Sequence, residues 1–286
     1  MAEILQLIIY GIVLGSIITL GAIGVSMIFG ILRFAHFAHG DIMTLGAYLA
    51  LIGVGPLSLP MLGVFPLAIV ATGFIAAGID RLIYRNLRSS SPIIMLISSV
   101  GTALMLRSLI QLVWGPDNKI YTSGISMPYT FADLQIKPEQ ITIVLGTVAL
   151  VILLHLFLHR TSMGKAMRAM SDNLNLARIS GINTERVIFW AWIIAAGLGA
   201  AGGIFLGIDT RLNPIMGWRL LLPVFAAAIL GGIGSYYGAI LGGIIIGISQ
   251  ELSTLFISPA YKPAIAFGIM VLMLIFRPTG IMGGQK

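Results

Sequence analysis

The sequence predicts an all-α polytopic membrane protein with about eight or nine transmembrane or half-membrane helices. Three observations predict it. Of the 286 residues, 58% are hydrophobic and only 9% are charged, whereas roughly a quarter of the residues of soluble domains are charged. The mean hydropathy is +1.01. The apolar residues also fall into runs of about 20, the length that a helix needs to cross a bilayer. One transmembrane domain over residues 1–286 is expected.

The apolar runs give the elements in order. Residues 4–32 are followed by Arg33 rather than by a small-residue cleavage site, so this first run predicts a retained span. Residues 42–53 are too few for a regular span and predict a half-membrane helix. Residues 220–250 are too many for one helix, and the glycine-rich stretch Gly231–Ser235 predicts a break that divides them into two elements. The remaining spans are expected over residues 60–79, 92–113, 141–158, 187–208 and 262–276.

The basic residues predict the orientation, because cytoplasmic loops of membrane proteins carry an excess of Lys and Arg. With the amino terminus outside and the carboxy terminus in the cytosol, eleven of the 17 basic residues lie in inner loops: Arg33, Arg81, Arg85, Arg88, Arg160, Lys165, Arg168, Arg178, Arg186, Arg277 and Lys286. Five lie in outer loops: Lys119, Lys137, Arg211, Arg219 and Lys262. An outer loop is expected over about 114–140, where three prolines prevent a long helix.

Glycine is abundant in the spans, and small residues recur four positions apart. The pairs are Gly11/Gly15, Gly199/Gly203, Gly203/Gly207, Gly234/Gly238, Gly238/Gly242 and Gly243/Gly247. This spacing lets two helix backbones approach closely in lipid. It is compatible with packing inside one subunit, which we favour, and with a dimer interface.

The motifs of an enzyme are missing. His159 stands where a phosphate-binding loop ending in Gly164-Lys165 would need its first glycine, so this chain is not expected to bind or hydrolyse ATP. Gly231–Gly234 follows no expected strand, which argues against a dinucleotide site. Cysteine is absent, so thiolate metal sites and thiol nucleophiles are excluded. The net charge of +7 comes from loops rather than from a basic domain, and no nucleic-acid partner is expected.

The acidic residues argue against a proton-coupled carrier, which needs a carboxylate inside the membrane. All ten are expected at span ends or in loops: Glu3, Asp41, Asp80, Asp117, Asp133, Glu139, Asp172, Glu185, Asp209 and Glu251. Arg107 is the one charge expected within a span. Three interpretations are open: the side chain extends to the outer interface, which we favour, it pairs with a buried partner such as Glu251, or it takes part in cargo passage.

The histidines form two close pairs. His36 and His39 lie near Asp41, and His155 and His159 are one helical turn apart. No third and fourth ligand is evident, so polar anchors are favoured over a metal site. Asp41 ends the polar stretch that precedes the predicted half-membrane helix. It either stabilises the amino terminus of that helix or contacts cargo.

The segment 160–186 predicts a short amphipathic helix on the cytosolic side. Its apolar stripe follows helical spacing: Met163, Met167, Met170, Leu174 and Ala177. The helix either breaks at Ser171-Asp172 or continues past it. Gly181 is suited to end the helix, and Thr184 is suited to cap the next span. The helix either lies on anionic lipid or docks in a partner's groove, for which a methionine-lined face is well adapted.

Several stretches, in the same order along the chain, resemble those of one family. They are Phe37–Asp41 with Gly46–Leu49, Thr161–Ala169, Gly181–Asn183, Phe225–Ser235 and Arg277–Gly280. Nearly end to end, the chain resembles the LivH-type permease subunit of the ABC importers for branched-chain, hydrophobic or other neutral amino acids. The stretch Phe37–Asp41 favours the LivH type over its LivM-like sister.

The resemblance implies a complex in the inner or plasma membrane of a bacterium or archaeon. Its other members would be a LivM-like sister permease, two cytosolic ATPase subunits and an extracytoplasmic amino acid binding protein. This chain would bind no cofactor, and ATP and Mg²⁺ would bind to the ATPase subunits. Residues 160–186 resemble the loop of a coupling helix, which docks on an ATPase. The candidate coupling residues are Met163, Gly164, Met167, Arg168, Met170, Leu174, Ala177, Arg178 and Gly181.

The function predicted is that of a permease subunit that couples ATP hydrolysis on partner subunits to amino acid uptake. Polar side chains within spans should face a cavity or the protein interior, which makes eight residues candidates for the translocation path: Ser16, Thr19, His39, Thr44, Tyr48, Ser98, Thr102 and Gln111. The alternatives are a passive channel for small neutral solutes, a permease of the same family for urea or short amides, and a membrane scaffold that transports nothing.

Overall fold

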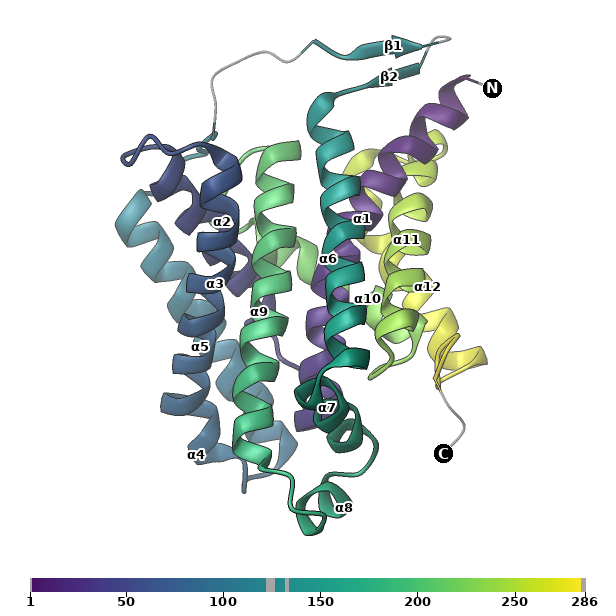
Figure 1. Cartoon of the computed structure of the whole chain (residues 1–286). Coiled ribbons are helices and arrows are strands. Elements are labelled where there is room, and N and C mark those ends of the chain that lie inside the picture. The colour runs from purple at the N-terminus through teal and green to yellow at the C-terminus, as the bar shows by residue number, and fades with distance from the viewer. Residues whose placement is uncertain (1, 122–126, 132–133, 284–286) are drawn as a thin grey trace.

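The computed structural model describes residues 2–121, 127–131 and 134–283 as a bundle of helices with one small hairpin (Figure 1). The long or apolar helices are α1 (Ala2–Leu32), α2 (His39–Val54), α3 (Met61–Ile79), α5 (Pro92–Trp114), α6 (Pro138–Arg160), α9 (Thr184–Asp209), α10 (Met216–Gly231), α11 (Tyr236–Leu252) and α12 (Lys262–Phe276). The short helical elements are η1 (Asp80–Tyr84), α4 (Arg85–Leu87), α7 (Ser162–Asp172), α8 (Leu174–Ile179), η2 (Ser253–Leu255) and η3 (Pro259–Tyr261). The antiparallel hairpin consists of β1 (Tyr129–Phe131) and β2 (Leu134–Ile136).

The predicted fold class is confirmed. Within the described residues, seven helical segments are long and apolar enough to cross a membrane, and α2 and α10 are the two shorter apolar helices. The predicted break at Gly231–Ser235 falls between the end of α10 and the start of α11. The sequence did not predict η1, a π-helical turn that carries α3 on toward α4.

The molecule has two ends with different elements (Figure 1). The amino terminus and the β1–β2 hairpin lie at one, which we call the hairpin end. Helices α4, α7 and α8 and the carboxy-terminal segment lie at the other, which we call the α8 end. The predicted outer loop therefore lies at the opposite end from the predicted coupling segment. Residues 122–126 and 132–133 of that loop, and Lys286, are outside the described residues.

The two half-membrane helices begin inside the bundle, and their amino termini meet there. The ring of His39, at the start of α2, packs against Gly24 of α1 and against Gly199, near the middle of α9. Gly40 of α2 contacts Gly217 of α10 backbone to backbone. A helix leaves its first N–H groups without partners, and Thr44 of α2 accepts a hydrogen bond from the N–H of Gly217 at 3.1 Å.

The arrangement around this contact is roughly symmetric. Helices α1 and α9 are both long and buried over most of their length, and each is followed by a half-membrane helix and then a full span. α1 packs against α10 and α11, whereas α9 packs against α2 and α3. Transporters often combine internal repeats of inverted topology with broken helices at the transport path, and the symmetric arrangement here is of that type.

The glycine pairs are used within the subunit. Gly11 and Gly15 of α1 pack against Ile248 and Ile244 of α11. In the other pairs, Gly243 and Gly247 pack on α1, Gly199 and Gly203 on α2, Gly207 on Leu212, Gly238 on Gly231, and Gly242 on Ala227, while Gly234 lies near Gly30. The interpretation that these spacings form packing contacts inside one subunit is therefore confirmed for the described residues.

The contact between the half-helices gives a first prediction. A Cβ atom at Gly217 would overlap the carbonyl oxygen of Gly40, so Gly217→Ala should cost about 1–3 kcal/mol through overpacking. A shorter thermal inactivation half-life in detergent would record the loss. Gly268→Ala in α12 is the matched control, because a Cβ there has no atom within 4 Å. Equal half-lives for the two variants would contradict the expected role of the glycine contact.

Candidate functional site

The α8 end is built by a succession of helix caps. The side chain of Thr161 accepts from the N–H of Gly164 at 2.9 Å and starts α7. Asn173 interrupts the helical path and caps α8, accepting from the N–H of Leu176 at 3.0 Å. Gly181, with a φ of +83°, follows the end of α8 and is used as predicted, because glycine favours this conformation. The break lies at Asn173 rather than at Ser171-Asp172.

The predicted cap of α9 is wrong by one residue. Asn183, not Thr184, precedes the first residue of α9, and its side chain accepts from the N–H of Arg186 at 3.1 Å. Asparagine and threonine are both good capping residues. Asn183 takes the capping position because its backbone is extended, whereas Thr184 is already the first residue of the helix.

The methionine stripe of α7 faces the core of this chain, and its role in docking on a partner stays a prediction. Met167 and Met170 are 0% and 1% exposed, and they pack into the core of this chain together with Gly164 and Ala177. Met163, Leu174 and Arg168 are partly buried. Helix α7 is therefore held against the bundle by its methionine face.

Helix α8 presents the exposed apolar side chains of this region. Leu176 is 58% exposed and Ile179 is 81% exposed, and Arg178 lies between them on the same exposed helix. Two large aliphatic side chains at the tip of a loop that also carries a cation are the features of a small protein-docking surface.

α7 links this tip to the bundle. The Nη2 atom of Arg33, just after α1, donates to the carbonyl oxygen of Ser171 at 2.6 Å. Gly30 of α1 packs against the Ser171 side chain, and α7 also packs on α6 and α9. The turn between α10 and α11 is joined to α1 as well, since the N–H of Gly234 donates to the Oγ of Ser26 at 2.8 Å. A force on α8 can thus be transmitted to α1 and, through it, to the half-helix α10.

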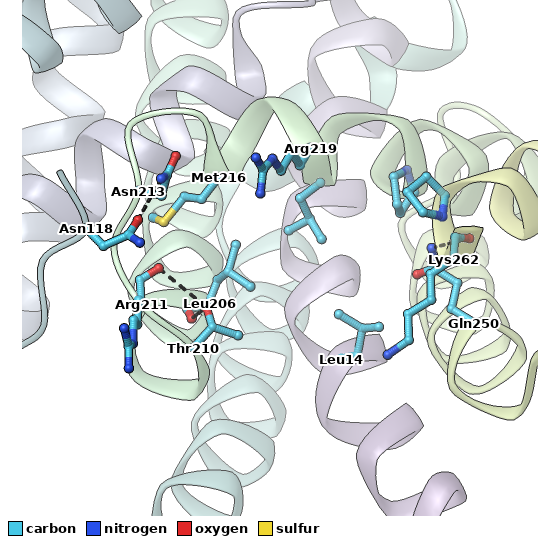
Figure 2. A pocket seen from close by; sticks show the side chains of 13 residues that line it. Leu14, Asn118, Leu206, Thr210, Arg211, Asn213, Met216, Arg219, Gln250 and Lys262 are labelled. Carbon is cyan, nitrogen blue, oxygen red and sulfur yellow. Dashed lines mark hydrogen bonds between the residues drawn. The ribbon is translucent and has the colours of Figure 1, made fainter. Parts of the chain in front are cut away.

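A cavity of about 720 Å³ opens at the hairpin end, between the end of α9, the start of α10 and the junction of α11 with α12 (Figure 2). We call it the α10 cavity. Figure 2 shows Thr210, Arg211 and Asn213 on one side of it and Gln250 and Lys262 on the other. The full lining is Leu14, Asn118, Leu206, Thr210, Arg211, Asn213, Met216, Arg219, Leu220, Pro223, Gln250, Lys262 and Pro263.

The lining of the α10 cavity contains three basic residues and no acidic one. Lys262 is neutralised by Glu251, 2.6 Å away. Among the ion pairs of the described residues, none involves Arg211 or Arg219. Arg219 lies in the first turn of α10, where the helix dipole adds positive potential. The cavity is thus suited to an anionic group.

Nearby, Tyr121 anchors the loop that follows α5. Its hydroxyl group donates to the carbonyl oxygen of Ala47 at 2.8 Å. Burial raises the pKa of the Tyr121 phenol above its usual value, because the charged phenolate would be poorly solvated there. The phenol therefore stays protonated and remains a donor at neutral pH.

Asp41 and Arg107 form a buried ion pair, which corrects two expectations. Arg107 does not extend to the interface but pairs with a buried partner, which is Asp41 rather than Glu251: its Nε and Nη2 atoms each lie 3.0 Å from an oxygen of Asp41. Asp41 does not lie at a span end, because α2 begins inside the bundle, and its side chain is 0% exposed. The guanidinium group of Arg107 also lies 4.7 Å from the ring of Trp218 in α10. The pair therefore joins α2, α5 and α10.

None of the eight predicted path residues lines the α10 cavity. Ser16, Thr19, His39, Thr44, Tyr48 and Thr102 are buried, Ser98 is partly buried, and Gln111 is exposed. The hydroxyl groups of Ser16, Thr72 and Thr102 donate to the carbonyl oxygen in the preceding turn of their own helices. Helical hydrogen bonding explains such polar groups in spans without a path.

One histidine of each pair has a tyrosine partner. The Nε2 atom of His36 lies 3.0 Å from the hydroxyl oxygen of Tyr84, and the Nδ1 atom of His155 lies 2.6 Å from that of Tyr237. Within the described ranges, no group of three His, Cys, Asp or Glu side chains could hold a metal ion.

The sequence reasoning missed the residues of the α10 cavity because it assigned Arg211 and Arg219 to an ordinary outer loop. Asn213-Pro214 was the available signal: a turn that leads into a glycine-containing apolar helix. Asn213 does form such a turn, since its side-chain oxygen accepts from the N–H of Ile215 at 2.9 Å.

The fold defines a polytopic membrane permease. It combines apolar spans, two half-membrane helices that meet inside the bundle, a cavity at one end and an exposed helical tip at the other. The family of permease components of branched-chain amino acid transport systems matches residues 7–274. The chain belongs to this family, and it is a membrane transport subunit.

Relatives support the assignment. The high-affinity branched-chain amino acid transport system permease protein LivH of Escherichia coli K12 is 34% identical, over 98% of this chain and 95% of that protein. The permease protein LivM, of the same-named transport system in the same organism, is 32% identical over 53% of this chain and 37% of its own length. Systems of this kind thus contain a sister permease that this chain resembles less.

A solved structure supports the fold. PsaBC from Streptococcus pneumoniae in complex with Fab contains a chain that aligns with a TM-score of 0.56 and 15% identity, over 98% of this chain and 93% of that one. This likeness concerns the fold alone.

Proposed function

We propose that this chain forms one half of the membrane pathway of an ATP-driven importer for branched-chain, hydrophobic or other neutral amino acids. The observation that carries the proposal is the similarity to LivH of E. coli, which extends over nearly all of both chains. In this function the chain works as one permease domain and is not an enzyme. Its partners are a LivM-like sister permease, two cytosolic ATPase subunits that bind ATP and Mg²⁺, and an extracytoplasmic binding protein.

The orientation follows from the charges. In the proposed arrangement the hairpin end faces outward, the α8 end faces the cytosol, and the protein resides in the inner or plasma membrane of a bacterium or archaeon. The excess of basic residues around α4, α7 and α8 supports this direction. The binding protein would then release cargo near the α10 cavity, and the ATPase subunit would contact α8.

Uptake by the assembled complex tests the proposal. Proteoliposomes that contain both permeases and the ATPase subunits should accumulate labelled leucine only when the binding protein is outside and ATP is inside. Leucine accumulation that is unchanged without internal ATP would contradict the proposal. A passive channel would instead equilibrate small neutral solutes regardless of ATP, and competition by urea or acetamide but not by leucine would indicate the amide-transporting alternative.

A further inference from the structure

The α10 cavity lies between two helix ends of opposite polarity. Helix α9 ends at Asp209, next to Thr210 in the lining, and α10 begins at Met216. The carboxy-terminal end of a helix carries a partial negative charge and the amino-terminal end a partial positive charge. The cavity therefore offers a weakly negative wall and a positive wall to the same ligand.

The side chains strengthen the positive wall and add a hydrogen-bond acceptor to the other wall, which also carries the cation Arg211. Arg219 stands on the positive side, exposed and without an acidic partner among the described ion pairs. A guanidinium group can bind both oxygens of a carboxylate. On the other wall, the hydroxyl group of Thr210 donates to the carbonyl oxygen of Leu206 at 2.8 Å, which leaves its oxygen free to accept a hydrogen bond from an ammonium group.

The remaining lining is aliphatic. Leu14, Leu206, Leu220 and Pro223 come from α1, α9 and α10. Pockets that bind small molecules commonly combine such apolar walls with a few polar groups that fix the orientation. A zwitterion with an aliphatic side chain matches Arg219, the end of α9 and the aliphatic part of this lining, whereas urea has neither a carboxylate nor an alkyl group.

We infer that the α10 cavity is a cargo site of the permease, in which Arg219 binds the α-carboxylate of the amino acid, the end of α9 at Thr210 receives the α-ammonium group, and the aliphatic wall receives the side chain. This inference rests on the proposed function and adds to it the location of a cargo-binding site within the chain. It makes this subunit, and not the binding protein alone, discriminate in favour of α-amino acids.

The test measures transport and ATP hydrolysis separately in the proteoliposomes of the complete complex. In Arg219→Gln, leucine imported per ATP hydrolysed should fall about tenfold, as expected for one lost charge-assisted hydrogen bond, while ATPase stimulation by the binding protein stays within about twofold. Arg219→Lys should lie between this variant and the wild type. Lys119→Gln is the control, because Lys119 lies on the same side of the molecule but outside the lining.

Photo-crosslinking of the unmodified chain provides a second measurement that does not depend on how the variants assemble. A leucine analogue with a diazirine in its side chain, delivered by the binding protein, should label peptides that contain Leu206 or Leu220, and excess leucine should suppress the label. Labelling confined to other segments, or an import-to-hydrolysis ratio in Arg219→Gln equal to that of the wild type, would overturn the inference. Either result leaves the proposed function standing if wild-type uptake requires ATP, whereas ATP-independent wild-type uptake would refute the function itself.

Discussion

A single carboxylate at the tip of α8 should stop coupled uptake while leaving the permease folded. Ile179 is 81% exposed, so Ile179→Asp should change the stability of the isolated subunit by no more than about 0.5 kcal/mol. In the complex the same carboxylate would be buried against an ATPase subunit. We expect a loss of about 2 kcal/mol in docking, or roughly 30-fold in affinity for the ATPase subunit. Co-purification and leucine uptake measure the two consequences.

The control adds the same charge to the same helix without removing an apolar contact. Asn175 is exposed on α8, and Asn175→Asp should retain most of the uptake. If both aspartate variants lose uptake equally, the added charge rather than the apolar contact is responsible, and the proposed docking by Ile179 and Leu176 is wrong.

Helix α7 should respond differently. Met167 is fully buried in this chain, and Met167→Ala should lower the stability of the subunit by about 2–5 kcal/mol, the usual range for such core truncations. The remaining folded complexes should still couple ATP hydrolysis to uptake. The contrast between α7 and α8 separates the residues that hold the coupling loop in place from those that contact the partner.

The sequence was sufficient to predict the spans but not the depth of their ends. Apolar runs located each helix to within a few residues, because the membrane requires a minimum apolar length. The sequence could not show that the chain turns back into the bundle after Arg33. As a result of this turn, His39 packs against Gly199, 160 positions later. Asp41 was expected at a span end because the sequence does not show this return of the chain into the bundle. Periodicity likewise identified the stripe on α7, but it could not show that the stripe faces the chain's own core.

The cavity residues illustrate the same limit. Arg211 has the appearance of a loop residue because its neighbours in the sequence are polar or turn-forming. Arg219 stands directly before the apolar run Leu220–Leu222, so the sequence places it at the outer end of a span. Their place in one lining with Leu14 and Lys262 depends on the packing of α1, α10 and α12. Contacts between such distant segments are not encoded in any local pattern of residues.

Breaking the ion pair between Asp41 and Arg107 should have the second large effect. Asp41→Asn leaves the guanidinium group of Arg107, 16% exposed in its side chain, without its counterion inside the bundle. Arg107→Met leaves the carboxylate of Asp41 equally unpaired. Each single change should cost about 3–5 kcal/mol, because an uncompensated buried charge is strongly unfavourable. The thermal inactivation half-life of the subunit in detergent would report the loss.

The double variant distinguishes a buried charge from a local packing defect. Asp41→Asn combined with Arg107→Met leaves no unpaired charge, so it should be more stable than either single variant. Recovery should be incomplete, since the contact of Arg107 with Trp218 is also lost. Arg85→Gln provides the comparison at the surface: its pair with Glu185 is about half exposed on both sides and should contribute at most about 1 kcal/mol. A double variant no more stable than the single ones would refute the assignment of the cost to the unpaired charge.

The position of this pair explains why its loss should also affect transport. Asp41 lies in the first turn of α2, Arg107 in α5, and Trp218 in the first turn of α10. The two half-helices meet closely at Gly40 and Gly217, and the ion pair and the ring contact help to fix how α10 is set against α2. Arg219, the proposed carboxylate ligand, follows Trp218 directly. At temperatures where the single variants remain folded, we therefore expect leucine imported per ATP to fall in Asp41→Asn but not in Arg85→Gln.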